Sequence, residues 1–144
     1  MITIEELRPI LRAAWDADTC DPHDYPWRPE NPSRGQCGVT ALVLNDLLGG
    51  ELILGEVFVD GVKVGHHWWN RLPGGDVDLT ADQFHPGEVV TPGEVRQRPA
   101  GPPARCREQY ELLRARVLDA LAGRPGERTG PERITRRADR PPAG

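Results

Sequence analysis

The chain has 144 residues, of which 38% are hydrophobic and 28% charged, which suits one globular domain with a core. The formal net charge of −4 argues against a general nucleic-acid binder, because such proteins neutralise phosphates with excess basic side chains. No apolar run approaches the roughly 20 residues of a membrane-spanning helix, and the charged N-terminal segment argues against a signal peptide. The three cysteines are too few and too far apart for a disulfide framework. We therefore expect a cytoplasmic protein with reduced thiols and no nucleic-acid or membrane partner.

Residues 2–15 have the pattern of an amphipathic helix. Thr3 and Glu6 form a capping box, and apolar residues recur at helical spacing. Pro9 disturbs this helix, which we expect to begin later or to kink there. The loop predicted at 18–35 contains four prolines and several side chains suited to lining a site. These are Cys20, His23, Tyr25, Trp27 and Arg34.

Residues 36–48 predict a second helix, which Gly49-Gly50 ends. The helix is apolar on nearly all sides, a pattern typical of a helix buried in the middle of a domain.

Strand patterns follow at 52–59 and 62–72, separated by Asp60-Gly61, a two-residue hairpin signal. A second turn at 73–76 leads to a third strand from Val77. A simple hairpin there would place Leu72 opposite Val77 and Arg71 opposite Asp78.

The rest of the chain is less regular. Residues 85–103 are rich in Pro and Gly, repeat Pro-Gly-Glu-Val at 86 and 92, and predict an irregular crossing loop. Residues 104–122 predict a helix with Cys106 on its buried stripe. We expect 1–123 to form a single domain, and the Arg- and Pro-rich tail 124–144 to be disordered. The pattern as a whole predicts an α+β fold in which a central helix packs on a small antiparallel sheet.

Cys37 is the strongest candidate for chemistry. It falls at the start of the apolar helix, where unpaired N–H groups and partial positive charge favour a thiolate over a thiol. Arg34 is close in sequence. The Gln36 amide and the backbone N–H groups are candidates for stabilising an oxyanion.

His67 and Asp78 are the candidate partners of this thiol. Strand alternation puts His67 on one face with Trp69 and Arg71. Asp78 shares that face several residues along, so a bulge or twist must bring its carboxylate to the imidazole. His67 would take the proton of the thiol and Asp78 would orient the imidazole. Two structural alternatives remain open: His67 packs on Trp69 as a cross-strand pair, or Asp78 pairs with Arg71.

The residues around these positions resemble a known family. The segments Ser33–Val43, His67–Pro73 and Asp78–Thr80, with Gln83-Phe84, look like the YunG-like family of small bacterial proteins. The resemblance covers roughly residues 1–122 and implies Cys37, His67 and Asp78 as a set, without a substrate. This chain departs from the family picture in its tail and in Trp68, where Tyr is expected. The order Cys, His, Asp also resembles that of papain-like and transglutaminase-like folds.

These observations predict a thiol-dependent hydrolase or acyltransferase that acts on a small amide or peptide-like substrate without a cofactor. Candidate oxyanion- and substrate-binding residues are Gln36, Arg34, Trp27, Trp69 and Asn70. One alternative is a non-catalytic module that binds a ligand or protein on the same fold. Another is a small zinc-binding protein that uses Cys20, His23 and Cys37. The sequence does not indicate an oligomeric state.

Overall fold

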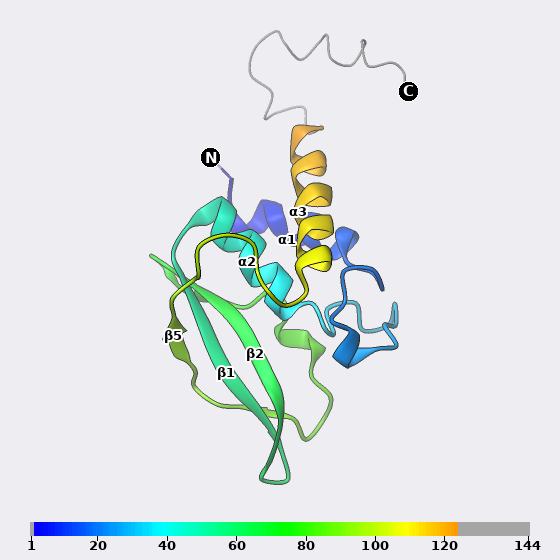
Figure 1. The fold of residues 1–144 in the computed structure, drawn as a ribbon, viewed down its shortest axis with the longest axis vertical. Coiled ribbons are helices and arrows are strands. Elements are labelled where there is room, and N and C mark those ends of the chain that lie inside the picture. Colours follow the sequence, from blue (N-terminus) through cyan, green and yellow to red (C-terminus); the bar gives the residue numbers. More distant parts are fainter. Residues whose placement is uncertain (1, 124–144) are drawn as a thin grey trace, which may run out of the picture.

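A computed structural model describes residues 2–123 and shows an α+β fold, as predicted. Three α-helices and a five-stranded antiparallel sheet form it (Figure 1). In chain order the elements are α1 (Ile4–Ala14), the 3₁₀ helix η1 (Pro22–Asp24), α2 (Cys37–Leu48), β1 (Glu51–Val59), β2 (Val62–Leu72), β3 (Gly75–Val77), the 3₁₀ helix η2 (Ala81–Gln83), β4 (Val89–Val90), β5 (Glu94–Arg96) and α3 (Arg107–Ala122).

β1 is the central strand of the sheet. It pairs with β2 on one side and with both β4 and β5 on the other, and β3 extends the sheet beyond β2. The β1–β2 hairpin closes at Asp60-Gly61, as predicted. Both turn residues have positive φ, 50° and 80°, as a tight two-residue hairpin with strand-matching twist requires.

The segment 85–103 was expected to be an irregular loop, and this expectation was wrong in part. Each copy of the Pro-Gly-Glu-Val repeat leads into a short strand on β1: the first into β4 and the second into β5. The glycines of the two copies, Gly87 and Gly93, both have positive φ. The repeat therefore turns the chain twice toward the same edge of β1.

The β2–β3 register also differs from the prediction. The turn consists of Pro73 and Gly74 alone, so Leu72 lies opposite Gly75 and Arg71 lies opposite Asp76. This moves Asp78 two residues closer to His67 than the predicted pairing with Arg71. A shift by two residues preserves the face of the strand, so Asp78 shares the face of His67 in either register. The observed register brings the two side chains closer without a bulge.

α2 lies between the sheet on one side and α1 and α3 on the other (Figure 1). The core brings together apolar residues of all three helices with Leu79, and the Trp15 indole donates a hydrogen bond to Thr40 Oγ1 at 2.9 Å. The capping box of Thr3 and Glu6 is present, and α1 contains Pro9. The fully buried side chains include Leu7, Leu11, Val43, Leu44, Leu113 and Val117. The central, buried position predicted for the apolar helix is confirmed.

Within residues 2–123, no helix combines the length and the apolar character that crossing a membrane requires. The tail predicted to be disordered, 124–144, lies outside the described residues.

Two glycines with nearly equal φ provide a test of the packing between α2 and the sheet. Gly50 (φ 81°) lies so close to β2 that an added Cβ would be 2.4 Å from the Arg71 carbonyl oxygen, whereas a Cβ at Gly61 (φ 80°) meets nothing within 4 Å. We expect Gly61→Ala to lower the free energy of unfolding by about 1–2 kcal/mol, the cost of a left-handed conformation. Gly50→Ala should lower it further. Urea unfolding measures both, and equal losses would contradict the close contact.

Candidate functional site

Cys37 is the first residue of α2 and is half-buried. Gln36 precedes it as the N-cap, and within the described residues its side chain makes no capping hydrogen bond. The first backbone N–H groups of α2 therefore keep the unpaired character of a helix start. The sulfur therefore lies at the start of the helix, as the sequence predicted.

His67 and Asp78 form the best-defined polar pair near Cys37. His67 Nε2 lies 2.6 Å from Asp78 Oδ2, and the histidine side chain is 1% exposed while that of the aspartate is 27% exposed. The sequence-based alternative that Asp78 pairs with Arg71 is wrong. Arg71 instead donates to Asp76, at 2.6 Å from Nε, as the observed register requires.

The charge state of His67 reflects opposing effects. Burial disfavours the charged ring and lowers its pKa, but the hydrogen bond to Asp78 and the neighbouring Cys37 thiol outweigh it and raise the pKa to about 9. Nδ1 is buried and makes no hydrogen bond of ordinary geometry in the described part of the chain. The Cys37 thiol therefore lies next to the ring but does not form a hydrogen bond of ordinary geometry with it. At neutral pH the structure favours an imidazolium beside Cys37.

Thr80 and Phe84, which had no role in the predicted site, hold this pair in place together with Trp69. Asp78 Oδ1 accepts hydrogen bonds from both the backbone N–H and the hydroxyl of Thr80, at 3.3 Å each. The Phe84 ring meets the imidazole edge-on at 4.7 Å, and Trp69 stacks on it at 5.5 Å. The Asp-x-Thr spacing at 78–80, typical of a turn in which Asp bonds two residues ahead, is the sequence signal that could have identified Thr80.

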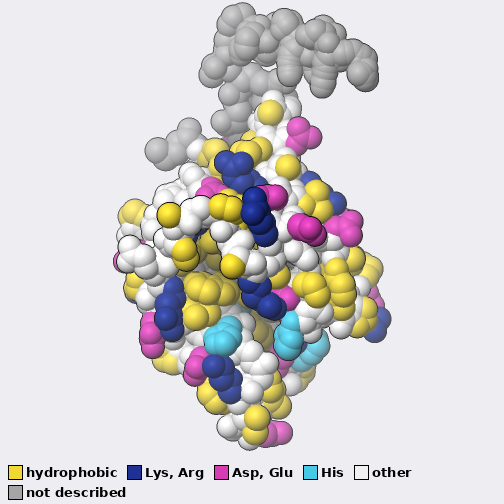
Figure 2. Space-filling model, viewed as in Figure 1, with side chains coloured by type: hydrophobic (Ala, Val, Ile, Leu, Met, Phe, Trp, Pro, Cys, Tyr) yellow, Lys and Arg dark blue, Asp and Glu magenta, His cyan; other side chains and the backbone are white. Residues whose placement is uncertain are grey.

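A cavity of about 1000 Å³ opens beside Cys37, between α2 and the sheet. Its lining includes Cys37, Gly38 and Trp68, together with apolar residues of α2 and β1 and charged residues of the surrounding loops. Figure 2 shows hydrophobic side chains recessed near the centre of this face, with His and Arg or Lys side chains around them. A nucleophile at the edge of a cavity of this size is well placed to meet a small-molecule substrate.

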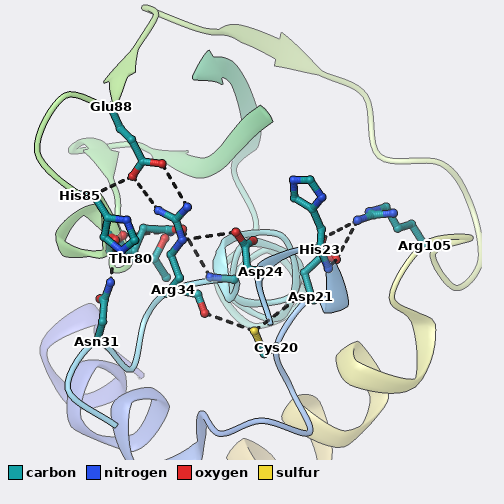
Figure 3. Close-up of polar contacts among 12 residues, drawn as sticks. Cys20, Asp21, His23, Asp24, Asn31, Arg34, Thr80, His85, Glu88 and Arg105 are labelled. Carbon is teal, nitrogen blue, oxygen red and sulfur yellow. Dashed lines mark hydrogen bonds and ion pairs between the residues drawn. The ribbon is translucent and has the colours of Figure 1, made fainter. Parts of the chain in front are cut away.

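Arg34 lines the cavity, but its guanidinium is engaged (Figure 3). Nη1 and Nη2 donate to the two oxygens of Glu88 at 2.7 and 3.0 Å, and Nε lies 3.3 Å from Asp24. Glu88 Oε1 also accepts the His85 backbone N–H. The predicted substrate-binding role of Arg34 is therefore not seen. The side chain instead joins the loop 18–35 to the segment leading into β4.

Gln36 was expected to donate a hydrogen bond to an oxyanion, and the structure contradicts this. Its side chain is fully buried, and Nε2 already donates to the Asp16 carbonyl oxygen at 3.1 Å. The atom left without a partner is Oε1, an acceptor, which cannot stabilise negative charge. The backbone N–H groups at the start of α2 remain as the oxyanion donors.

Three further expected substrate contacts have structural roles instead. Trp27 Nε1 donates to the Pro32 carbonyl oxygen within its own loop. Asn70 is buried and donates to the Ala41 carbonyl oxygen, which fastens β2 to α2. Trp69 packs over Gly55 and Gly93 and donates to Asp76. None of the three lines the cavity, whereas Trp68 does.

The proposed zinc ligands do not converge. Cys20 is fully buried, and its sulfhydryl donates to the backbone carbonyls of Asp21 and Arg34. Burial and the nearby carboxylates of Asp24 and Asp21 raise the pKa of Cys20 to about 12. Among residues 2–123, no group of three or more His, Cys, Asp or Glu side chains is arranged to hold a metal ion.

Cys106 differs from its prediction as well. It precedes α3 as a left-handed N-cap (φ 56°) instead of lying on the helix, and it lines the cavity. Burial, and then the charge of Asp21, raise the pKa of Cys106. Cys20 and Cys106 are therefore both disfavoured as thiolates.

Comparison with known proteins gives a family and no activity. The sequence model of the family described as "YunG protein" matches residues 3–122. A Bacillus subtilis (strain 168) protein described as "Uncharacterized protein YunG" is 36% identical over 81 residues, which are 56% of this chain and 63% of that protein. No solved structure matches.

The His67–Asp78 pair predicts a specific titration. In the wild-type protein the His67 ring, followed by NMR, should titrate near pH 9. Asp78→Asn removes the charge that offsets burial, so the midpoint should fall by more than about one pH unit. Asp76→Asn is the matched control, because Asp76 contacts Trp69 and Arg71 but not His67. A midpoint that is unchanged in Asp78→Asn would show that Asp78 does not maintain the imidazolium.

Proposed function

This chain belongs to the YunG family, and we propose that it is a cysteine-dependent hydrolase or acyltransferase that acts on a small amide or peptide-like substrate. One observation carries the proposal. Cys37 starts α2 at the edge of the cavity, beside a buried His67 whose Nε2 lies 2.6 Å from Asp78 Oδ2. This is the arrangement that nucleophilic thiol chemistry requires.

The chemistry would proceed in two steps. The Cys37 thiolate attacks the substrate carbonyl carbon, and backbone N–H groups at the start of α2 stabilise the resulting oxyanion. As the C–N bond breaks, the His67 imidazolium gives its proton to the departing amine, and a thioester remains on Cys37. Water, or an amine in a transfer reaction, then attacks the thioester. It loses its proton to His67 and releases the acid or the new amide.

The layout also supports a resemblance to papain-like and transglutaminase-like enzymes in minimal form. The nucleophile begins a central helix, the histidine lies on a following antiparallel strand, and the acid comes next in the chain. Asp78 in this scheme orients the ring and stabilises its charge without itself accepting the proton.

Selective labelling tests the thiolate. At pH 7, iodoacetamide should alkylate Cys37 at least about tenfold faster than Cys20 or Cys106, as read by peptide mass spectrometry. His67→Ala should slow the labelling of Cys37 by a similar factor, because the neighbouring positive charge is lost. His66→Ala is the matched control, since His66 is the exposed neighbour in the same strand and should leave the rate unchanged.

Acylation tests the reaction itself. With p-nitrophenyl acetate, the wild-type protein should release p-nitrophenolate and gain one acetyl group on Cys37, and Cys37→Ser should do neither. Equal, slow alkylation of all three cysteines, together with no acetylation of Cys37, would favour the non-catalytic binding module on the same fold.

A further inference from the structure

The walls of the cavity divide by chemistry. Where the cavity runs between α2 and the sheet, most of its lining is apolar, although His66 of β2 and Arg96 of β5 also line it. α2 contributes Val39 and Leu42, β1 contributes Leu52 and Leu54, and β2 contributes the Trp68 indole. Apolar walls of this kind favour a hydrocarbon group that displaces water from between them.

Apart from Arg96 of β5, the acidic and arginine side chains that line the cavity come from loops and from η1, and its three arginines are paired. Arg34 is bonded to Glu88, Arg105 lies 2.7 Å from Asp21, and Arg96 lies 3.7 Å from Glu94. The guanidinium groups along the lining thus have carboxylate partners within the chain. Arg34 in particular is held by both Glu88 and Asp24, so an anionic ligand group would have to displace an existing, partly buried ion pair there.

Cys37 lies where these two parts meet. It follows Arg34 and Gly35 of the loop and precedes Gly38, whose backbone lies against Trp68: a Cβ added there would be 3.6 Å from the indole. A carbonyl carbon held at the sulfur therefore has the apolar slot on one side and the charged rim on the other.

On the basis of the proposed function, we infer that the substrate carries a hydrocarbon group several carbons long next to the scissile carbonyl. This group occupies the slot between α2 and the strands β1 and β2. The more polar remainder of the substrate, which leaves as the amine, lies at the charged rim. Aliphatic acyl groups and aromatic side chains are both hydrocarbon groups that could occupy the slot, and the ester series below distinguishes them.

Acyl-transfer rates from p-nitrophenyl esters to Cys37 test the slot. With acetyl, octanoyl and phenylacetyl esters, kcat/KM should be at least about tenfold higher for octanoyl than for acetyl if the occupant is aliphatic, since each buried methylene contributes favourably. A preference for phenylacetyl instead would assign an aromatic occupant. Leu54→Gln places a polar group in the slot and should remove the preference for octanoyl over acetyl, with circular dichroism as the check on folding. Val62→Gln, an exposed change on β2 away from the cavity, is the matched control and should keep the preference.

A binding measurement separates this inference from the proposed function. Cys37→Ser should bind octanamide by calorimetry at concentrations where acetamide does not bind. Acylation of Cys37 with equal rates for all esters would overturn the hydrocarbon slot and leave the thiol chemistry standing. Octanamide binding to Cys37→Ser without acylation of the wild type would support the slot and contradict the enzyme. Absence of both would overturn both.

Discussion

A charged imidazole buried in a protein loses its hydration, and a nearby carboxylate can offset that cost. The rest of this site depends on the pair of His67 and Asp78, which has this arrangement. His67 is 1% exposed, and its Nε2 lies 2.6 Å from Asp78. The aspartate raises the pKa of a ring that burial alone would lower. With the proton held on Nε2 toward Asp78, Nδ1 is the nitrogen left for Cys37 and its substrate.

The fold positions this pair through the sheet. The two-residue turn at Pro73-Gly74 fixes the β2–β3 register, so that Asp78 leaves β3 on the face of His67. Thr80 then holds the second carboxylate oxygen, and Trp69 and Phe84 confine the ring from two directions. On the other side, the Asn70 amide fastens β2 to the first half of α2. Hence the helix that carries the nucleophile and the strand that carries the base are fixed relative to each other.

Local patterns in the sequence were enough for part of this description. Helical periodicity and capping located all three helices to within a few residues, and Asp60-Gly61 located the main hairpin. The position of Cys37 at the start of α2 followed from the polar loop before an apolar run. Strand alternation correctly placed His67 and Asp78 on one face, because the observed β2–β3 register differs from the predicted one by two residues, which preserves the face.

Contacts between residues far apart in the sequence, and the strand register, could not be predicted from local patterns. The Arg71–Asp78 register was wrong because turn length cannot be read from a Pro-Gly-Gly-Asp sequence that allows more than one turn. β4 and β5 were missed because strands of two or three residues exist only through their pairing with β1. Gln36 and Asn70 were misassigned for a related reason: the partners that engage their amides, Asp16 and Ala41, lie 20 and 29 residues away in the chain.

The central claim is our proposal that Cys37 reacts as a nucleophile beside a charged His67. Ultraviolet difference spectroscopy measures the thiolate directly, by subtracting the spectrum of Cys37→Ser from that of the wild-type protein at pH 7. The account predicts the absorbance of close to one thiolate, which is lost in His67→Ala and kept in His66→Ala. A wild-type spectrum at pH 7 that does not differ from that of Cys37→Ser would contradict it.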